Sequence, residues 1–222
     1  MSQQEQVKHR ISIPKYTLGE ELISAISHGV GALLGIAALV LCIVKSCNPL
    51  DGYKLASSIV FGLTVTLLYL MSCLYHSLKV NKAKRVFRVI DHCTIFLLIA
   101  GTYTPYTLVS LRGALGWWIF GIIWGIAVLG IVLNAVNLKK FAKLSVGCYL
   151  IMGWIIVFAY RYMVQVMHPT SLALLIWGGV AYTVGAVLYA IGSKKKYFHS
   201  VFHFFCLAGT ILHFFSIYLY VL

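Results

Sequence analysis

Long apolar runs separated by short polar segments dominate the sequence from residue 22 onward. A helix that crosses a bilayer needs about 20 predominantly apolar residues. The segments between the runs contain charged residues, Pro or Asn, which interrupt a lipid-facing helix because unpaired backbone groups cannot lie in hydrocarbon. The pattern predicts an all-α membrane protein, a bundle of seven transmembrane helices with spans at residues 22–44, 55–78, 89–111, 117–136, 144–164, 171–193 and 199–220.

The composition supports this class of protein. Of the 222 residues, 61% are hydrophobic and 10% are charged, against roughly 45–50% and 25% in soluble domains, so a soluble globule is excluded. Residues 1–20 are polar and lack the compact basic-then-apolar pattern of a cleaved signal peptide. We therefore expect residues 1–20 to form a cytoplasmic N-terminal segment and residues 21–222 to form a single seven-helix transmembrane domain.

The charge is strongly basic, with 18 Lys and Arg against 5 Asp and Glu. No basic-aromatic RNA motif, helix-turn-helix pattern or Gly-rich phosphate loop accompanies it, so we expect no nucleic-acid partner. Positively charged loops stay in the cytoplasm. Fourteen of the cations fall in the N-terminal segment and in the loops on its side of the membrane, and the other four are Lys45, Lys54, Arg112 and Arg161. The N-terminus is therefore predicted to be cytoplasmic and the C-terminus extracytoplasmic.

Ionisable residues inside spans are costly, so each is a candidate functional residue. The predicted topology brings five polar residues to the cytoplasmic side, within roughly two helical turns of 5.4 Å of the interface. They come from the second, third and seventh spans and are Ser72, His76, Asp91, His199 and His203.

The three histidines in this group suggest a metal site. His199 and His203 are four residues apart, so both project from one helix face and can hold the same ion. Neutral imidazole suits Zn²⁺, and a third ligand from His76 would leave the fourth tetrahedral position open for water or substrate. Asp91 could bond to that water, orient a ligand imidazole or be the fourth ligand itself. The alternative is that each histidine is a hydrogen-bonded packing residue.

Three further histidines lie in spans. A stripe of residues on the last span is predicted to face the bundle interior, and its members are His199, His203, Cys206, Thr210 and His213. His213 is about 21 Å along the helix from His199, too far to share a metal. His28, on the same face as Ser24 and Glu21, either supports the metal site or is capped by its own helix. His92 points about 100° away from the neighbouring Asp91 and is expected to pack elsewhere.

Four motifs are distinctive in this order: YTLGEELISAISHGVG, SCLYHS, VIDHCTIFLLIAGTYTPY and HSVFHFFCLAGTILHFF. With them the chain resembles the bacterial hemolysin III family, which is related to the progestin and adipoQ receptors, over essentially all of residues 16–222. The resemblance implies a zinc site with His76, His199 and His203 as ligands. It also implies that Asp91 and Ser72 contact the zinc-bound water or line the site.

The wider superfamily includes alkaline ceramidases, and the resemblance therefore implies hydrolysis of lipid amides by metal-activated water. We expect a zinc-dependent hydrolase of a lipid-like amide or ester in the bacterial cytoplasmic (inner) membrane, with membrane lipids as partners. In that scheme Asp91 takes the proton of the water and Ser72 is a hydrogen-bonding partner. The alternative is a non-enzymatic protein of membrane homeostasis, a sensor or a permeability-altering protein, with a structural zinc.

Overall fold

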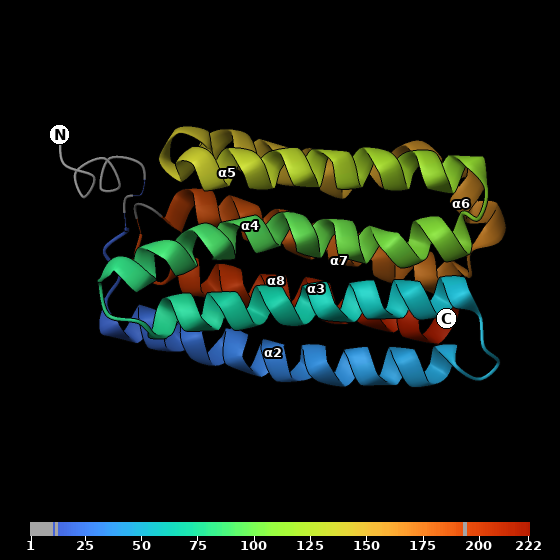
Figure 1. Ribbon diagram of the computed structural model, residues 1–222, viewed down its shortest axis with the longest axis horizontal. Helices are drawn as coiled ribbons and strands as arrows, with labels where there is room; N and C mark the ends of the chain where they lie inside the picture. The colour runs from blue at the N-terminus through green and yellow to red at the C-terminus, as the bar shows by residue number, and fades with distance from the viewer. Residues whose placement is uncertain (1–10, 12, 193–194) are drawn as a thin grey trace.

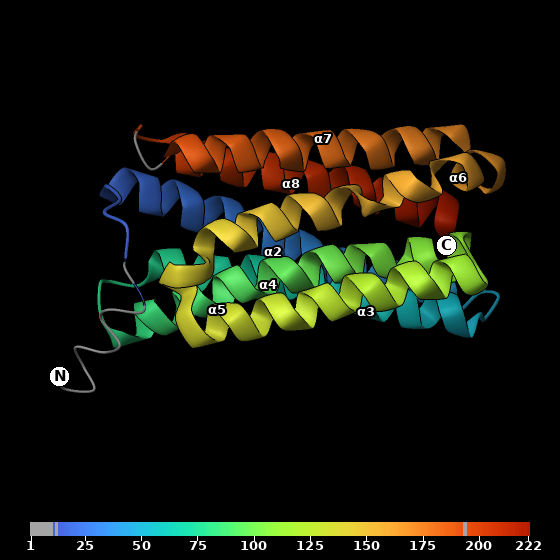
Figure 2. The same cartoon turned by 90° about the horizontal axis from the view of Figure 1, so that it is seen from above.

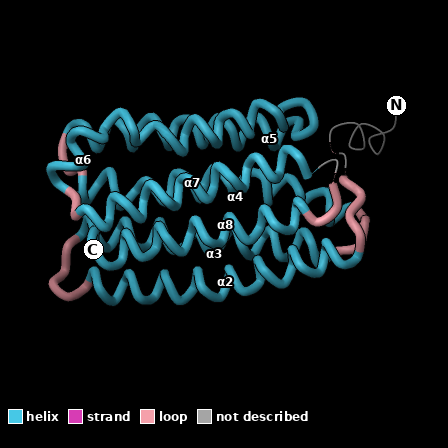
Figure 3. The backbone as a smooth tube through the Cα atoms, turned by 180° about the vertical axis from the view of Figure 1, so that it is seen from behind, coloured by secondary structure: helices cyan, strands magenta, loops and turns pink. Residues whose placement is uncertain are grey.

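The computed structural model describes residue 11, residues 13–192 and residues 195–222. The secondary-structure elements of these described residues are helices (Figures 1 and 3). Six of them are long and apolar enough to cross a membrane, so the predicted all-α architecture is confirmed. Most of the predicted N-terminal segment, residues 1–10 and 12, lies outside the described residues.

Polar caps start three of the helices earlier than hydropathy predicts. Thr17 and Glu20 form a capping box at the start of α2, and the side chains of Asp51 and Asn81 accept backbone N–H bonds at the starts of α3 and α4. Five helices each run in one direction along the bundle: α2 (Leu18–Ser46), α3 (Gly52–Ser77), α4 (Lys82–Pro105), α7 (Pro169–Gly192) and α8 (Phe198–Ser216). Five-residue π-helices, Tyr106–Ser110 (η1) and Ile217–Val221 (η3), extend α4 and α8.

The predicted spans 117–136 and 144–164 both fall in one helical stretch of 53 residues. It comprises α5 (Ala114–Trp154), the 3₁₀ turn Ile155–Ala159 and α6 (Tyr160–Val166). The stretch is not straight, because Asn137 has non-helical dihedrals and its side chain caps the amide of Lys140 at 3.0 Å. Figure 2 shows α5 reversing its direction in its yellow part and returning toward α6. Ser145 donates a 2.6 Å hydrogen bond to Asn134, which joins the two arms.

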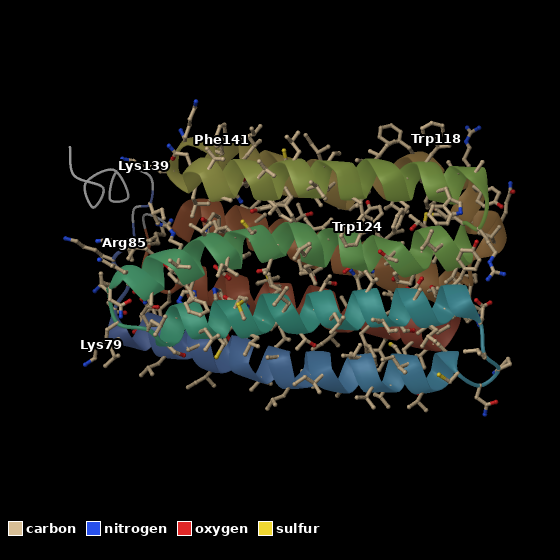
Figure 4. The ribbon with its side chains drawn as sticks, in the orientation of Figure 1. Lys79, Arg85, Trp118, Trp124, Lys139 and Phe141 are labelled. Atoms are coloured by element: carbon tan, nitrogen blue, oxygen red, sulfur yellow. The ribbon has the colours of Figure 1, made fainter. Side chains whose placement is uncertain are left out.

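The two ends of the bundle differ in charge. Helices α2, α4 and α8 begin at the end where α3 and α7 finish (Figure 1). In Figure 4, Lys79, Arg85 and Lys139 lie at this end, which we call the basic end, whereas Trp118 lies toward the other end. The site described below is built from helix turns at the basic end.

Polarity is inverted relative to a soluble protein. Large apolar side chains face outward, including Phe158 at 92% and Trp118 at 73% exposure. Polar groups are buried, and the predicted interior stripe of α8 is confirmed, since His199, His203, Cys206, Thr210 and His213 are all buried. Tyr69 and Tyr182 meet Thr210 there at 2.6 and 2.5 Å. An apolar exterior around a hydrogen-bonded interior is what a lipid environment requires.

Candidate metal centre

Three histidines converge near the basic end. His76 lies in the last turn of α3, and His199 and His203 lie in the first two turns of α8. The Nε2 atom of His199 is 3.3 Å from Nε2 of His76 and 3.1 Å from Nε2 of His203. All three residues are buried, and one ring nitrogen from each lies within 4.8 Å of the other two. The histidine triad, as we call these residues, could hold a metal ion.

Two of the three nitrogen separations in the triad match those of a zinc site. Zn–N bonds of about 2.0–2.1 Å at tetrahedral angles place neighbouring ligand nitrogens roughly 3.3 Å apart. The two Nε2 separations that involve His199, 3.3 and 3.1 Å, match this value. Three imidazoles from protein also leave one tetrahedral position for water or substrate, as in catalytic zinc sites.

A partly buried ion pair orients one member of the triad. Glu21 Oε2 on α2 accepts from His76 Nδ1 at 2.7 Å, and Lys84 Nζ on α4 donates to Glu21 Oε1 at 2.6 Å. Lys84 also donates to the carbonyl of Leu78 at 2.9 Å. A carboxylate on Nδ1 keeps that nitrogen protonated, so the Nε2 lone pair of His76 faces His199. Helices α2 and α4 thus fix the tautomer of a residue on α3.

Aromatic rings pack against the other two histidines. His28 stacks on His203 with ring centroids 3.8 Å apart, and Tyr16 stacks on His199 at 4.6 Å. Burial raises the pKa of Tyr16, which precedes α2, so its hydroxyl stays neutral. His28 therefore contacts the triad through its ring face. Glu21, which lies on the same face of α2 as His28, makes the direct hydrogen bond to His76.

Two members of the triad, His199 and His203, line a cavity of about 190 Å³. Each of the long helices contributes to its wall, with His28 from α2, Ser72 from α3, Asp91 from α4, Tyr149 from α5, Tyr182 from α7 and His203 from α8. Most of the wall is apolar, and it extends to Met163 and Leu172. The structure thus places Ser72 and Asp91 on the same cavity as His199 and His203. This combination can hold an apolar chain beside polar chemistry.

The position predicted for His92 is wrong. Its Nδ1 lies 3.5 Å from Oδ2 of Asp91, and both residues line the cavity. Helical side chains lean toward the helix N-terminus, and the His92 ring turns back far enough for Nδ1 to reach the Arg88 carbonyl at 2.9 Å. This turn overcomes the 100° between the two Cβ directions. Asp91 therefore has an imidazole neighbour of its own.

Three charged residues near the site were not predicted as part of it. The sequence pattern places Glu21 on the helix face of His28, and it places Lys84 and Arg88 in a loop. The predicted span began at residue 89, whereas α4 begins at Lys82. The seven additional helical residues include Lys84, whose exposure is 2%, and Arg88, which lines the cavity.

Fold and site together define a multi-pass, all-helical membrane protein with a buried histidine triad beside a cavity. The chain belongs to the haemolysin III family, because the family model described as Haemolysin-III related matches residues 16–214. It is 39% identical to Hemolysin-3 of Bacillus cereus over 203 residues, which cover 91% of this chain and 92% of that protein. It is also 39% identical to the Hemolysin-3 homolog of Bacillus subtilis (strain 168) over 205 residues, 92% of this chain and 96% of that protein.

A more distant relative is the human monocyte to macrophage differentiation factor, at 24% identity over 178 residues. These residues cover 77% of this chain and 72% of that protein. This similarity supports the predicted link between the family and its eukaryotic superfamily.

Proposed function

We propose that this protein is a zinc-dependent hydrolase that cleaves a lipid-like amide or ester in the bacterial inner membrane. The observation that carries the proposal is the cavity, which joins two imidazoles of the triad to a carboxylate and to a long apolar wall. A purely structural zinc site would be closed and would need no such cavity. Membrane lipids are the source of substrate that matches these walls.

The residues divide the chemistry between them. His76, His199 and His203 would hold Zn²⁺, which when bound supplies a Lewis acid and activates water at neutral pH. Asp91 accepts the proton of the attacking water and passes it to the leaving nitrogen or oxygen. Ser72 offers a hydroxyl for a hydrogen bond at the same cavity. The apolar wall holds the acyl chain and orients its carbonyl toward α8.

The proposal is tested with the purified full-length protein and mixed lipid amides and esters in micelles. We expect a released fatty acid that disappears on chelation and returns when Zn²⁺ is restored. Bound zinc at one equivalent with no turnover of any amide or ester would instead favour the structural-zinc alternative.

We also propose seven spans, with the two arms of α5 and α6 crossing the membrane separately and the basic end in the cytoplasm. Exposed lysines on the turn between the arms, Lys139 and Lys140, support this orientation. A reporter that is active only in the cytoplasm should be active when inserted after Lys139 and inactive when fused after Leu222. The reverse pattern would contradict the orientation, and activity at both positions would contradict the number of spans.

Glu21→Gln is expected to weaken zinc binding by about 10- to 100-fold, because the ligand His76 loses the carboxylate that fixes its tautomer. Competition with a chelator of known affinity measures this change. Glu20→Gln is the matched control. Its carboxylate bonds to the amides of Thr17 and Tyr197 rather than to the triad, and glutamine can still complete the capping box. Equal zinc affinities in the two variants would exclude a role for Glu21.

A further inference from the structure

Arg88 is a cation on the cavity wall without a counter-ion in the described structure. It lines the cavity together with Asp91, one helical turn further along α4, and with Tyr16. Its Nε atom is buried and has no hydrogen-bond partner. No ion pair joins its guanidinium to any carboxylate of residues 11, 13–192 and 195–222. A cation beside an apolar wall is costly unless an anion accompanies it.

The chain itself offers few anions. It has five acidic residues, and four of them have other polar partners. Glu20 accepts from the Tyr197 amide, Glu21 from Lys84, and Asp51 from Arg112. Asp91 lies against His92. The fifth, Glu5, is outside the described residues, so the candidate partners for Arg88 are Glu5 and an anionic ligand.

We propose that Arg88 binds an anionic group on the leaving-group side of the substrate. This inference rests on the proposed hydrolase and narrows its substrates to anionic single-chain lipid amides or esters, with a carboxylate or phosphate close to the scissile bond. Arg88 lies about 4.5 Å closer to the basic end than Asp91 along the helix axis. An acyl chain in the apolar part of the cavity, with its carbonyl beside Asp91, would direct a leaving group toward Arg88.

An N-acyl amino acid has this arrangement. In N-oleoylglycine the carboxylate is two bonds from the amide nitrogen, so it can reach the Arg88 guanidinium while the carbonyl stays beside Asp91. Water adds its oxygen to the carbonyl carbon, the C–N bond breaks, and the nitrogen receives the proton. The products are oleate and glycine, and no atom is oxidised or reduced. Arg88 contributes specificity and takes no proton in this reaction.

The test compares N-oleoylglycine with N-oleoylethanolamine, in which a neutral hydroxymethyl group replaces the carboxylate, and with the phosphate ester of N-oleoylethanolamine. Wild-type protein is expected to favour the anionic amides by about 10- to 100-fold in kcat/KM, the range for a desolvated charge-assisted hydrogen bond. Preference for only one of the anions identifies carboxylate or phosphate as the natural group. Equal use of all three amides would overturn the inference and leave the hydrolase proposal intact.

Arg88→Gln is expected to abolish the preference while turnover of N-oleoylethanolamine persists, which also shows that the variant is folded. Arg88→Lys should retain part of the preference for anionic amides. Arg85→Gln is the matched control, since it removes the same charge from the same helix and Arg85 points outward at the basic end (Figure 4). An unchanged preference in Arg88→Gln, or an equal loss in Arg85→Gln, would contradict the assignment.

Equilibrium binding separates this inference from the proposed function. If the wild-type protein hydrolyses no amide and no ester, the hydrolase proposal fails, yet the affinity ratio for the same ligands still tests Arg88. An anion preference that is lost in Arg88→Gln supports the site. No preference in the wild type, with one gained in Glu5→Gln, shows that Glu5 is the partner of Arg88 and overturns the inference.

Discussion

Replacing His203 by alanine is expected to lower bound zinc from one equivalent per chain to a small fraction of that. His203 is an integral member of the triad, because its Nε2 is 3.1 Å from that of His199 and its ring stacks on His28. Two imidazoles from different helices would remain, and a site with two protein ligands does not retain zinc against a chelator. Metal analysis of the purified protein measures the loss. His199→Ala should give the same result.

His213→Ala is the matched control for this loss. His213 is also a buried histidine of α8, but its Nε2 donates a hydrogen bond to the carbonyl oxygen of Leu175 on α7 at 3.1 Å. Its substitution removes the same group from the same helix about 15 Å further along. We expect His213→Ala to keep a full equivalent of zinc. Equal zinc contents in His203→Ala and His213→Ala would rule out the triad as the metal site.

Features that depend on local periodicity could be predicted from the sequence. The spacing of His199 and His203 places them on one face of any helix, and the structure brings their Nε2 atoms within 3.1 Å. Hydropathy predicts that the second span ends at residue 78, and this end sets the depth of His76 in the membrane. An error of one helical turn in the position of this end would still leave His76 beside α8. The interior stripe of α8 could be identified in the same way.

Features that depend on how helices are rotated against one another could not be predicted. Glu21 and His76 are 55 residues apart, and their contact requires a particular rotation of α2 against α3. Lys84 and Arg88 were misplaced for a different reason. Hydropathy begins a span at the first apolar run, whereas the side chain of Asn81 caps a helix that starts seven residues earlier. Charged residues that belong to the site were therefore interpreted as topology signals.

Asp91→Asn is expected to lower kcat for the lipid amide by about 10²–10⁴-fold, the usual contribution of a general acid–base group. Asparagine keeps the shape of the side chain and one acceptor oxygen but cannot accept a proton from the attacking water. The cavity and the triad should be undisturbed, because the Asp91 carboxylate pairs with His92, at 3.5 Å from Nδ1, rather than with a residue of the triad. Turnover and zinc content are measured on the same preparation.

The zinc content of Asp91→Asn decides between two of the roles that the sequence leaves open for this carboxylate, proton acceptor and direct zinc ligand. A proton acceptor can be lost without loss of metal, so one equivalent of zinc with little turnover supports general base catalysis. A direct fourth ligand cannot be lost in this way, and a simultaneous fall in zinc affinity would place Asp91 in the coordination sphere. Turnover equal to that of the wild type would remove Asp91 from the mechanism. No other carboxylate among the described residues lines the cavity and could accept the proton in its place.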